Sequence, residues 1–281
     1  MSANTAFAQP IAPGIDAIKA KQKATWEDGN YASFAKFMEA GAIEILNAWK
    51  IAPNQTLLDV ACGSGQTAIP AAKNGIKVTG IDIAENLIQH ARKRAEDAGL
   101  DIPFDVGDAE SLPYSNNSFD VVISLIGAMF APRPEKVVSE CARVLKTGGK
   151  LFMANWTSAS MPAKMFKCVS KFAPPPPGLP PPVLWGDEET VRQRLANDFT
   201  DIRLTRKMYP QWHYPFDAAA LVKLFRTQFG PVKKAFDSVD PQQQKELQSS
   251  LEQIYLDAGE TANGVLTITN GEYLEVVATR R

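Results

Sequence analysis

The sequence has 281 residues, a formal net charge of −1 and 45% apolar residues. This length and apolar content predict one large folded unit rather than a disordered chain. The balanced charge, without a dense lysine or arginine run, argues against nucleic acid as a partner. No apolar run approaches the ~20 residues of a membrane-spanning helix.

The three cysteines, Cys62, Cys141 and Cys168, suit a reducing compartment better than a disulfide framework. The N-terminus lacks the basic start and apolar core of a secretion signal. We therefore expect a cytoplasmic protein.

The first 156 residues predict helices followed by a regular alternation of strands and helices. Residues 1 to about 14 are expected to be irregular, and a helical stretch broken at Gly29-Asn30 extends to residue 50. Short apolar runs separated by helical patterns come next, which is typical of parallel βαβ units with helices on both faces of a sheet. The predicted strands are 56–61, 77–83, 102–109, 119–126 and 150–156.

The regular alternation ends after Trp156. Residues 161–173 and 187–197 predict helices, 201–214 a strand, and 217–258 about two helices. We divide the chain into an N-terminal helical lid (1–50), a core (51–156), a C-terminal helical cap for the substrate (157–265) and a closing edge strand of the core sheet (266–281). The predicted fold class is α/β, a doubly wound and mostly parallel sheet.

The stretch LLDVACGSGQTA, residues 57–68, places Gly63 and Gly65 between a strand and a helix, where backbone N–H groups can face a ligand. Taken alone, this loop also fits a dinucleotide. Asp59 would repel a pyrophosphate but attract an ammonium or sulfonium group. Asp82 can accept both ribose hydroxyls, and Asp108 with Ala109 can read an adenine edge. Together these residues predict a pocket for an adenosine with an amino-acid tail and no phosphates.

Four stretches, LLDVACGSG, GIDIAENLIQHARKRA, GDAESLPYSNNSFDVV and ECARVLKTGGKLFMANW, resemble in order the motifs of class I S-adenosylmethionine-dependent methyltransferases. The branch with the nearest resemblance contains the ubiquinone and menaquinone C-methyltransferases. The resemblance covers roughly residues 50 to 156. It implies a seven-stranded Rossmann-like sheet, S-adenosyl-L-methionine as cofactor and S-adenosyl-L-homocysteine as product.

The resemblance also implies roles for individual residues. Asp59, Ala61, Gly63 and Gly65 would hold the methionine moiety, Asp82 the ribose and Ile83 the adenine face. Asp108 and Ala109 would read the adenine edge, and Leu125 would pass near the sulfonium. The family often has glycine at the position of Ala61, and an alanine is tolerated there if its φ is negative.

Residues outside these motifs are candidates for the lid and the acceptor site. Tyr31 either covers the cofactor or packs between helices. Met129 and Phe130 either face the acceptor or belong to the core. Trp212, His213 and Tyr214 form an aromatic stretch in the cap, and His213 is the one weak candidate for a catalytic base, its alternative being a structural role. The catalytic residue is otherwise unassigned, and we expect no metal site.

The sequence thus predicts a methyltransferase that acts by in-line transfer on a small, partly apolar acceptor, for which an aromatic or quinone-like molecule is consistent. C-, O- and N-methylation stay open, as does the choice between monomer and homodimer. The alternatives are an NAD-dependent oxidoreductase, although the sequence has no Tyr-x-x-x-Lys pair, and a non-catalytic S-adenosylmethionine-binding module.

Overall fold

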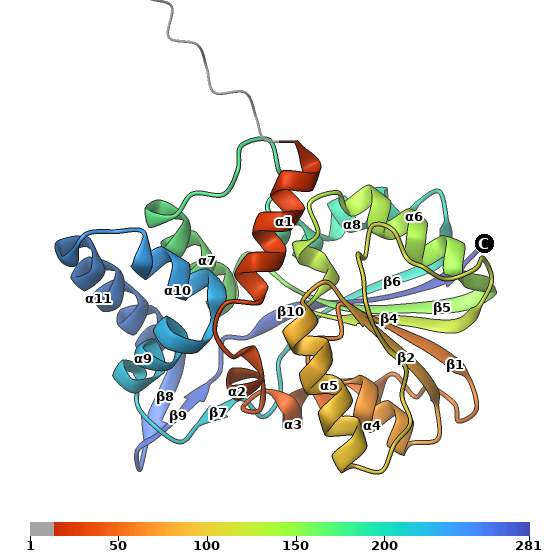
Figure 1. The fold of residues 1–281 in the computed structure, drawn as a ribbon, viewed down its shortest axis with the longest axis horizontal. Helices are drawn as coiled ribbons and strands as arrows, with labels where there is room; N and C mark the ends of the chain where they lie inside the picture. Colours follow the sequence, from red (N-terminus) through yellow and green to blue (C-terminus); the bar gives the residue numbers. More distant parts are fainter. Residues whose placement is uncertain (1–13) are drawn as a thin grey trace, which may run out of the picture.

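The structure is a computed structural model that describes residues 14–281. Residues 1–13, which were expected to be irregular, lie outside the described residues. A seven-stranded sheet with the order β3-β2-β1-β4-β5-β10-β6 runs through the molecule (Figure 1). Its strands are β1 (Thr56–Val60), β2 (Lys77–Asp82), β3 (Phe104–Val106), β4 (Phe119–Leu125), β5 (Leu145–Trp156), β6 (Phe199–Met208) and β10 (Glu272–Arg280).

The first five strands of this sheet pair in parallel, as predicted. Leu57, Leu58 and Val60 of β1 are fully buried because helices cover both faces of the sheet. The helices that connect these strands are α4 (Ala68–Lys73), α5 (Glu85–Asp97) and α6 (Pro134–Val144). The strand order reverses at β1, which lies between β2 and β4, so a crevice opens at the carboxyl ends of these strands. The predicted doubly wound α/β fold with a seven-stranded sheet is confirmed.

The last strand is not at the edge of the sheet, so that part of the prediction is wrong. β10 is antiparallel to β5 on one side and to β6 on the other, which leaves β6 at the edge. The alternation of β10 suggested a half-exposed strand, but Leu274, Val276 and Ala278 are fully buried between the helical layers. β6 also lies within residues 157–265, so this segment contributes to the core sheet as well as to the cap.

The cap contains more elements than its sequence suggested. Residues 201–214 do not form one strand, because the chain turns at Gln211, whose φ is 48°, and then enters a second sheet of order β7-β9-β8. Residues 217–258 form three helices rather than two, since Gly230-Pro231 starts an additional one. The cap elements are α7 (Met161–Phe172), η2 (Pro182–Gly186), α8 (Glu188–Leu195), β7 (His213–Tyr214), α9 (Ala218–Gln228), α10 (Gly230–Asp237), α11 (Pro241–Asp257), β8 (Gly259–Ala262) and β9 (Val265–Ile268).

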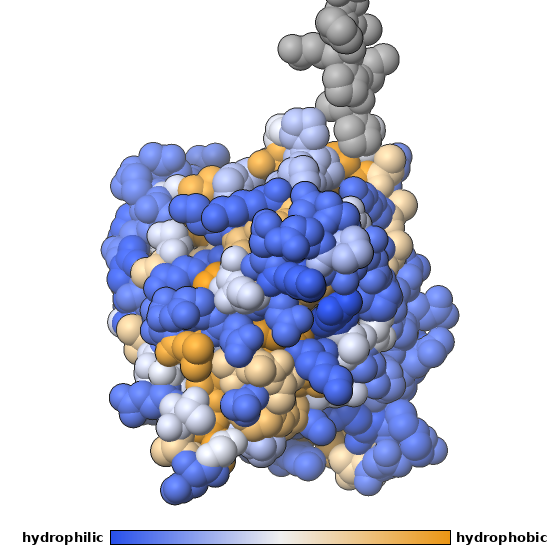
Figure 2. Space-filling view, turned by 90° about the vertical axis from the view of Figure 1, so that its left-hand side faces the viewer, coloured by the Kyte–Doolittle hydropathy of each residue, from blue (hydrophilic) through white to orange (hydrophobic). Residues whose placement is uncertain are grey.

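Three helices precede the sheet: α1 (Ile15–Trp26), α2 (Tyr31–Ala35) and α3 (Glu39–Ala48). Figure 1 shows α1 between the cap helices α7 and α10 on one side and the sheet with its helices on the other. The outer face of the cap is mostly hydrophilic, with a smaller hydrophobic area (Figure 2). The large hydrophobic residues exposed in the cap are Leu256 and Val265. The remaining apolar side chains of the cap pack between its own helices, α7, α9, α10 and α11, and against α1 and α2.

Candidate functional site

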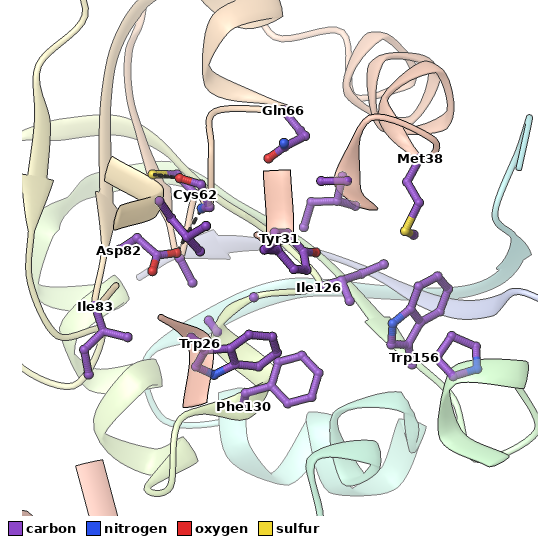
Figure 3. A pocket seen from close by; sticks show the side chains of 18 of the residues that line it. Trp26, Tyr31, Met38, Cys62, Gln66, Asp82, Ile83, Ile126, Phe130 and Trp156 are labelled. Atoms are coloured by element: carbon purple, nitrogen blue, oxygen red, sulfur yellow. Dashed lines mark hydrogen bonds between the residues drawn. The ribbon is translucent and has the colours of Figure 1, made fainter. Parts of the chain in front are cut away.

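One cavity lies at the carboxyl ends of the strands, and α1, α2 and the cap close it. We call its two sides the loop half and the aromatic half. The loop half is formed by the chain after β1, β2 and β3, and includes Gly63, Asp82 and Asp108. The aromatic half includes Phe34, Met38, Phe130, Trp156, Met161, Met165, Phe166, Tyr209, Trp212, Phe225 and Phe229. Figure 3 shows Asp82 and Ile83 on one side of this cavity and Trp156 on the other.

Asp82 holds the glycine loop in place. It ends β2 and is 8% exposed. Its Oδ2 accepts a hydrogen bond of 2.9 Å from the backbone N–H of Gly63, and its Oδ1 accepts one of 2.9 Å from Ala84. Burial raises the pKa of this carboxyl. Each carboxylate oxygen keeps lone pairs for hydroxyl donors that enter the cavity.

The loop residue Ala61 has a φ of 56°, so the expectation of a negative φ is wrong. The sharp turn after β1 requires this left-handed conformation, which costs an alanine roughly 1–2 kcal/mol. Ala61 lines the cavity and packs against Gly127 of the neighbouring loop. A Cβ on Gly127 would lie 2.4 Å from the Ala61 carbonyl oxygen and 2.6 Å from its Cβ. The two loops therefore approach each other where only one methyl group fits.

We expect Ala61→Gly to raise the free energy of unfolding by about 0.5–1 kcal/mol, because relief of the left-handed strain outweighs the added entropy of the unfolded chain. Urea denaturation checks this. The matched control is Ala71→Gly in α4, which lowers the same quantity by about 1 kcal/mol because its backbone is helical. Equal losses of stability in both variants would contradict the assignment of strain to Ala61.

Asp59 and Gly65 lie behind the cavity wall and are not among the residues that line it. Asp59 is 1% exposed, and one of its carboxylate oxygens accepts a hydrogen bond from the Thr67 hydroxyl. Its Oδ1 has no hydrogen-bond partner within the described part of the chain. Burial is the main cause that raises the pKa of Asp59 to about 7. Gly65 packs under the loop, where a Cβ would lie 3.1 Å from Ile69 Cδ1.

The raised pKa of Asp59 predicts a particular pH dependence. Between about pH 4, near the unfolded pKa, and pH 7, the folded state binds more protons than the unfolded state. The free energy of unfolding therefore falls as the pH rises through this window. We expect wild type to lose on the order of a few kcal/mol relative to Asp59→Asn across it. Denaturation at several pH values measures the difference, and parallel profiles for the two proteins would contradict it.

The third loop is covered by α1. Lys19 of α1 contacts Asp108 Oδ2 and Glu110 Oε2, each at 2.5 Å, and Arg133 contacts the same Glu110 oxygen at 2.7 Å. Asp108 also caps its own turn, because its Oδ1 accepts a hydrogen bond from Glu110 N. The three residues proposed for the adenine all line the cavity: Ile83, Asp108 and Ala109. Lys19 was not singled out from the sequence, since a lysine on an amphipathic helix normally reads as solvent-exposed.

Tyr31 lies where α1 and α2 meet the glycine loop, and it lines the cavity. Burial, with a contribution from the nearby Asp82 charge, raises the pKa of Tyr31 to about 12. Its hydroxyl is therefore protonated at neutral pH. Trp26, at the end of α1, packs against Phe130 and Phe229 with ring centroids 5.1 and 5.9 Å away. Tyr31 and Trp26 thus close the cavity between the loop half and the aromatic half.

The end of β4 lies between the two halves of the cavity. Leu125 lines the cavity, and Ile126 follows it with a φ of 59°. A β-branched residue in this conformation costs on the order of 1–3 kcal/mol. Its N–H is held by the carbonyl of Ala154 in the adjacent strand, at 2.9 Å. Figure 3 places Ile126 between Tyr31 and Trp156. No feature of the sequence distinguishes Ile126, because its strain depends on the turn after β4.

Only some of the residues proposed for the acceptor site line the cavity. Phe130 and Trp212 line the aromatic half, whereas Met129 and Tyr214 are buried outside the cavity wall. His213 is exposed on β7 and its Nδ1 lies 3.0 Å from Thr267 Oγ1. The alternation of β7 turns Tyr214 inward and His213 outward, so the structure does not bring His213 to the cavity as a base.

Several cavity residues were missed by sequence reasoning. Trp156 was predicted only as the end of a strand, and residues 161–173 only as a helix of the cap. Met161, Met165 and Phe166 come from one face of α7. Their helical spacing was visible, but whether that face met a core or a cavity depended on the position of the cap.

The residues 14–281 contain no helix that is long and apolar enough to cross a bilayer. Within the same residues, no group of three or more histidine, cysteine, aspartate or glutamate side chains is placed to hold a metal ion. The charged side chains on the cavity wall, in this described part, are Lys19, Asp82 and Asp108.

Comparisons with known proteins indicate one family. A family model described as a methyltransferase domain matches residues 58–153. An uncharacterized protein of Mycobacterium tuberculosis is 31% identical over 266 residues, which cover 94% of this chain and 96% of that protein. The demethylmenaquinone methyltransferase of Renibacterium salmoninarum is 35% identical over 113 residues, 40% of this chain and 46% of that enzyme.

Solved structures share the fold. Phosphoethanolamine N-methyltransferase 2 of Haemonchus contortus, solved in complex with S-adenosyl-L-methionine, aligns with a TM-score of 0.55 and 20% identity. The alignment covers 85% of this chain and 51% of that one. The likeness at this identity concerns the fold alone.

Proposed function

This chain belongs to the class I S-adenosylmethionine-dependent methyltransferases, and on that premise we propose that it transfers a methyl group from S-adenosyl-L-methionine to a small, partly apolar acceptor. The observation that carries the proposal is the division of the cavity. The loop half presents carboxylates and backbone N–H groups, and the aromatic half presents almost exclusively apolar side chains.

The chemistry of the loop half fits a cationic nucleoside. The carboxylates of Asp82 and Asp108 line it. Lys19 is its one cation among the described residues, and this lysine is already paired with Asp108 and Glu110. A pyrophosphate would meet two carboxylates and no free cation, which disfavours the dinucleotide alternative. Bound there, S-adenosyl-L-methionine would supply an activated methyl group.

The proposed contacts follow the walls of the cavity. Asp82 would accept the ribose hydroxyls, and Ile83 would pack on the adenine, whose edge Asp108 and Ala109 would read. The loop around Ala61 and Gly63, together with Tyr31, would hold the methionine moiety. Asp59 and Gly65 would act from behind, by supporting the loop. Leu125 and Ile126 would mark the boundary at which the methyl group meets its acceptor.

The protein would act mainly by orientation and by exclusion of water. Orientation of two bound reactants can lower a barrier by roughly 7–11 kcal/mol. The tyrosines of the cavity wall, Tyr31 and Tyr209, have raised pKa values, and burial likewise raises the pKa of Cys62. These groups are protonated at neutral pH, so the acceptor must bring a nucleophile that is already competent.

We place the protein in a reducing, cytoplasmic compartment, which its three buried free cysteines favour.

A methyl-transfer assay tests this function. The purified protein is incubated with methyl-labelled S-adenosyl-L-methionine and a panel of phenols, naphthols and hydroxyquinones. We expect label in at least one apolar product, with one equivalent of S-adenosyl-L-homocysteine formed. Tight binding of the cofactor without transfer to any panel member would favour the non-catalytic module instead.

A further inference from the structure

Among residues 14–281, Trp156 presents an indole N–H to the aromatic half of the cavity without a hydrogen-bond partner. Trp156 ends β5 and is 4% exposed, yet it lines the cavity. Its indole Nε1–H has no hydrogen-bond partner among residues 14–281, and the same holds for Trp26 and Trp185, whereas Trp49 and Trp212 donate theirs to Glu275 Oε2 and the Tyr214 hydroxyl. Figure 3 shows the Trp156 nitrogen turned toward the interior, on the side of Ile126 and Tyr31.

The orientation of this indole is fixed by packing. Its ring stacks on Trp212 with a centroid distance of 5.5 Å and an interplanar angle of 17°. The Tyr209 ring packs beside it, with a centroid distance of 5.5 Å. The Tyr209 hydroxyl donates a hydrogen bond of 2.8 Å to the carbonyl oxygen of Met38. The ring therefore cannot turn its N–H elsewhere without disturbing the aromatic stack.

The surroundings of the donor are apolar. Met161, Met165 and Phe166 of α7, and Phe225 and Phe229 of the cap, line the same half. The Trp156 Nε1 is not among the fully buried side-chain nitrogens of residues 14–281, so solvent in the cavity can reach it. A hydrocarbon ligand that covers this N–H leaves a buried donor unpaired, at a cost of about 1–3 kcal/mol. A ligand oxygen that accepts from Trp156 avoids that cost.

We infer that Trp156 determines the specificity of the acceptor site by donating its indole N–H to a carbonyl or phenol-type oxygen on an otherwise apolar, flat acceptor. The inference rests on the proposed function and narrows its substrate class. The oxygen lies next to Ile126, at the boundary where the methyl group would arrive. Trp156 thereby positions the acceptor, and its indole proton is not transferred in the reaction.

The test uses two small probes of matched shape, α-tetralone, which carries a carbonyl oxygen, and tetralin, which does not. Both are titrated into the S-adenosyl-L-homocysteine complex of protein labelled with 15N at its five tryptophans. We expect the Trp156 indole N–H resonance to move downfield with α-tetralone but not with tetralin. We also expect α-tetralone to bind about tenfold more tightly than tetralin.

Two variants separate this role from simple packing. Trp156→Phe identifies the resonance by its loss and removes the donor, so the preference for α-tetralone should fall to about one. Trp49→Phe removes an indole outside the cavity wall whose N–H is already satisfied by Glu275, and the preference should persist. Equal affinities of wild type for the two probes, or an unchanged preference in Trp156→Phe, would overturn the inference.

The outcome is distinguishable from failure of the proposed function. Calorimetry on the same samples reports the affinity for S-adenosyl-L-homocysteine, which Trp156→Phe should leave within about twofold of wild type. A wild type that binds this nucleoside but shows no preference between the probes refutes the role of Trp156 alone. A wild type that binds neither the nucleoside nor α-tetralone refutes both.

Discussion

Asp82→Ala is expected to weaken the binding of S-adenosyl-L-homocysteine at least tenfold. The buried carboxylate would accept the two ribose hydroxyls, and a hydrogen bond to a charged group contributes about 1.5–3 kcal/mol. The same substitution releases the N–H groups of Gly63 and Ala84, so the glycine loop loses its anchor. Isothermal titration calorimetry measures the effect.

Asp97→Ala is the matched control for this variant. Asp97 ends α5 and is exposed, and among residues 14–281 it pairs only with Lys93, at 2.8 Å, in a surface contact. Its removal should leave the affinity unchanged, because exposed ion pairs contribute little. Asp82→Asn, which keeps one acceptor oxygen, should fall between wild type and Asp82→Ala. An Asp82→Ala protein with wild-type affinity would rule out the ribose contact.

Gly230→Ala is expected to detach α1 from the cap. Gly230 begins α10, and a Cβ at this position would lie 1.7 Å from the carbonyl oxygen of Thr25 in α1. Because backbone meets backbone here, no side-chain rotation relieves the clash, and α1 must move. We expect faster hydrogen exchange in residues 15–26 and a several-fold loss of affinity for S-adenosyl-L-homocysteine, since Lys19 and Trp26 move with the helix. Overpacking of this kind typically costs 1–3 kcal/mol.

Gly14→Ala provides the control, because a Cβ on Gly14, just before α1, meets nothing within 4 Å. Exchange of the β1 and β4 amides should be unaffected in both variants, since those strands lie in the sheet core. If Gly230→Ala leaves exchange in α1 and the nucleoside affinity as in wild type, α1 does not serve as the cover of the loop half.

The parts of the site predicted from sequence are those that the sheet itself positions. Asp82 ends a strand, Gly63 and Asp108 come shortly after strands, and parallel strands bring their carboxyl ends to one edge whatever the rest of the chain does. The motif order therefore indicated both the fold and the loop half of the cavity. Asp59 and Gly65 are exceptions, because the strand turns the Asp59 side chain behind the loop and Gly65 packs against Ile69 beneath it.

The parts that sequence reasoning missed depend on packing between distant segments. His213 and Tyr214 are adjacent, and which of them faces inward depends on the register of β7 against β9. The packing of Ala61 against Gly127 joins two loops that lie more than sixty residues apart in the sequence. The inward N–H of Trp156 follows from its stack on Trp212. None of these relations is local, so composition and periodicity carry no signal for them.

The central claim is that the loop half holds a phosphate-free adenosine with an amino-acid tail. Calorimetry of the wild-type protein with S-adenosyl-L-homocysteine beside NAD tests it most directly. The account predicts saturable one-to-one binding of S-adenosyl-L-homocysteine and no measurable heat with NAD. Binding of NAD in the absence of any binding of S-adenosyl-L-homocysteine would contradict it.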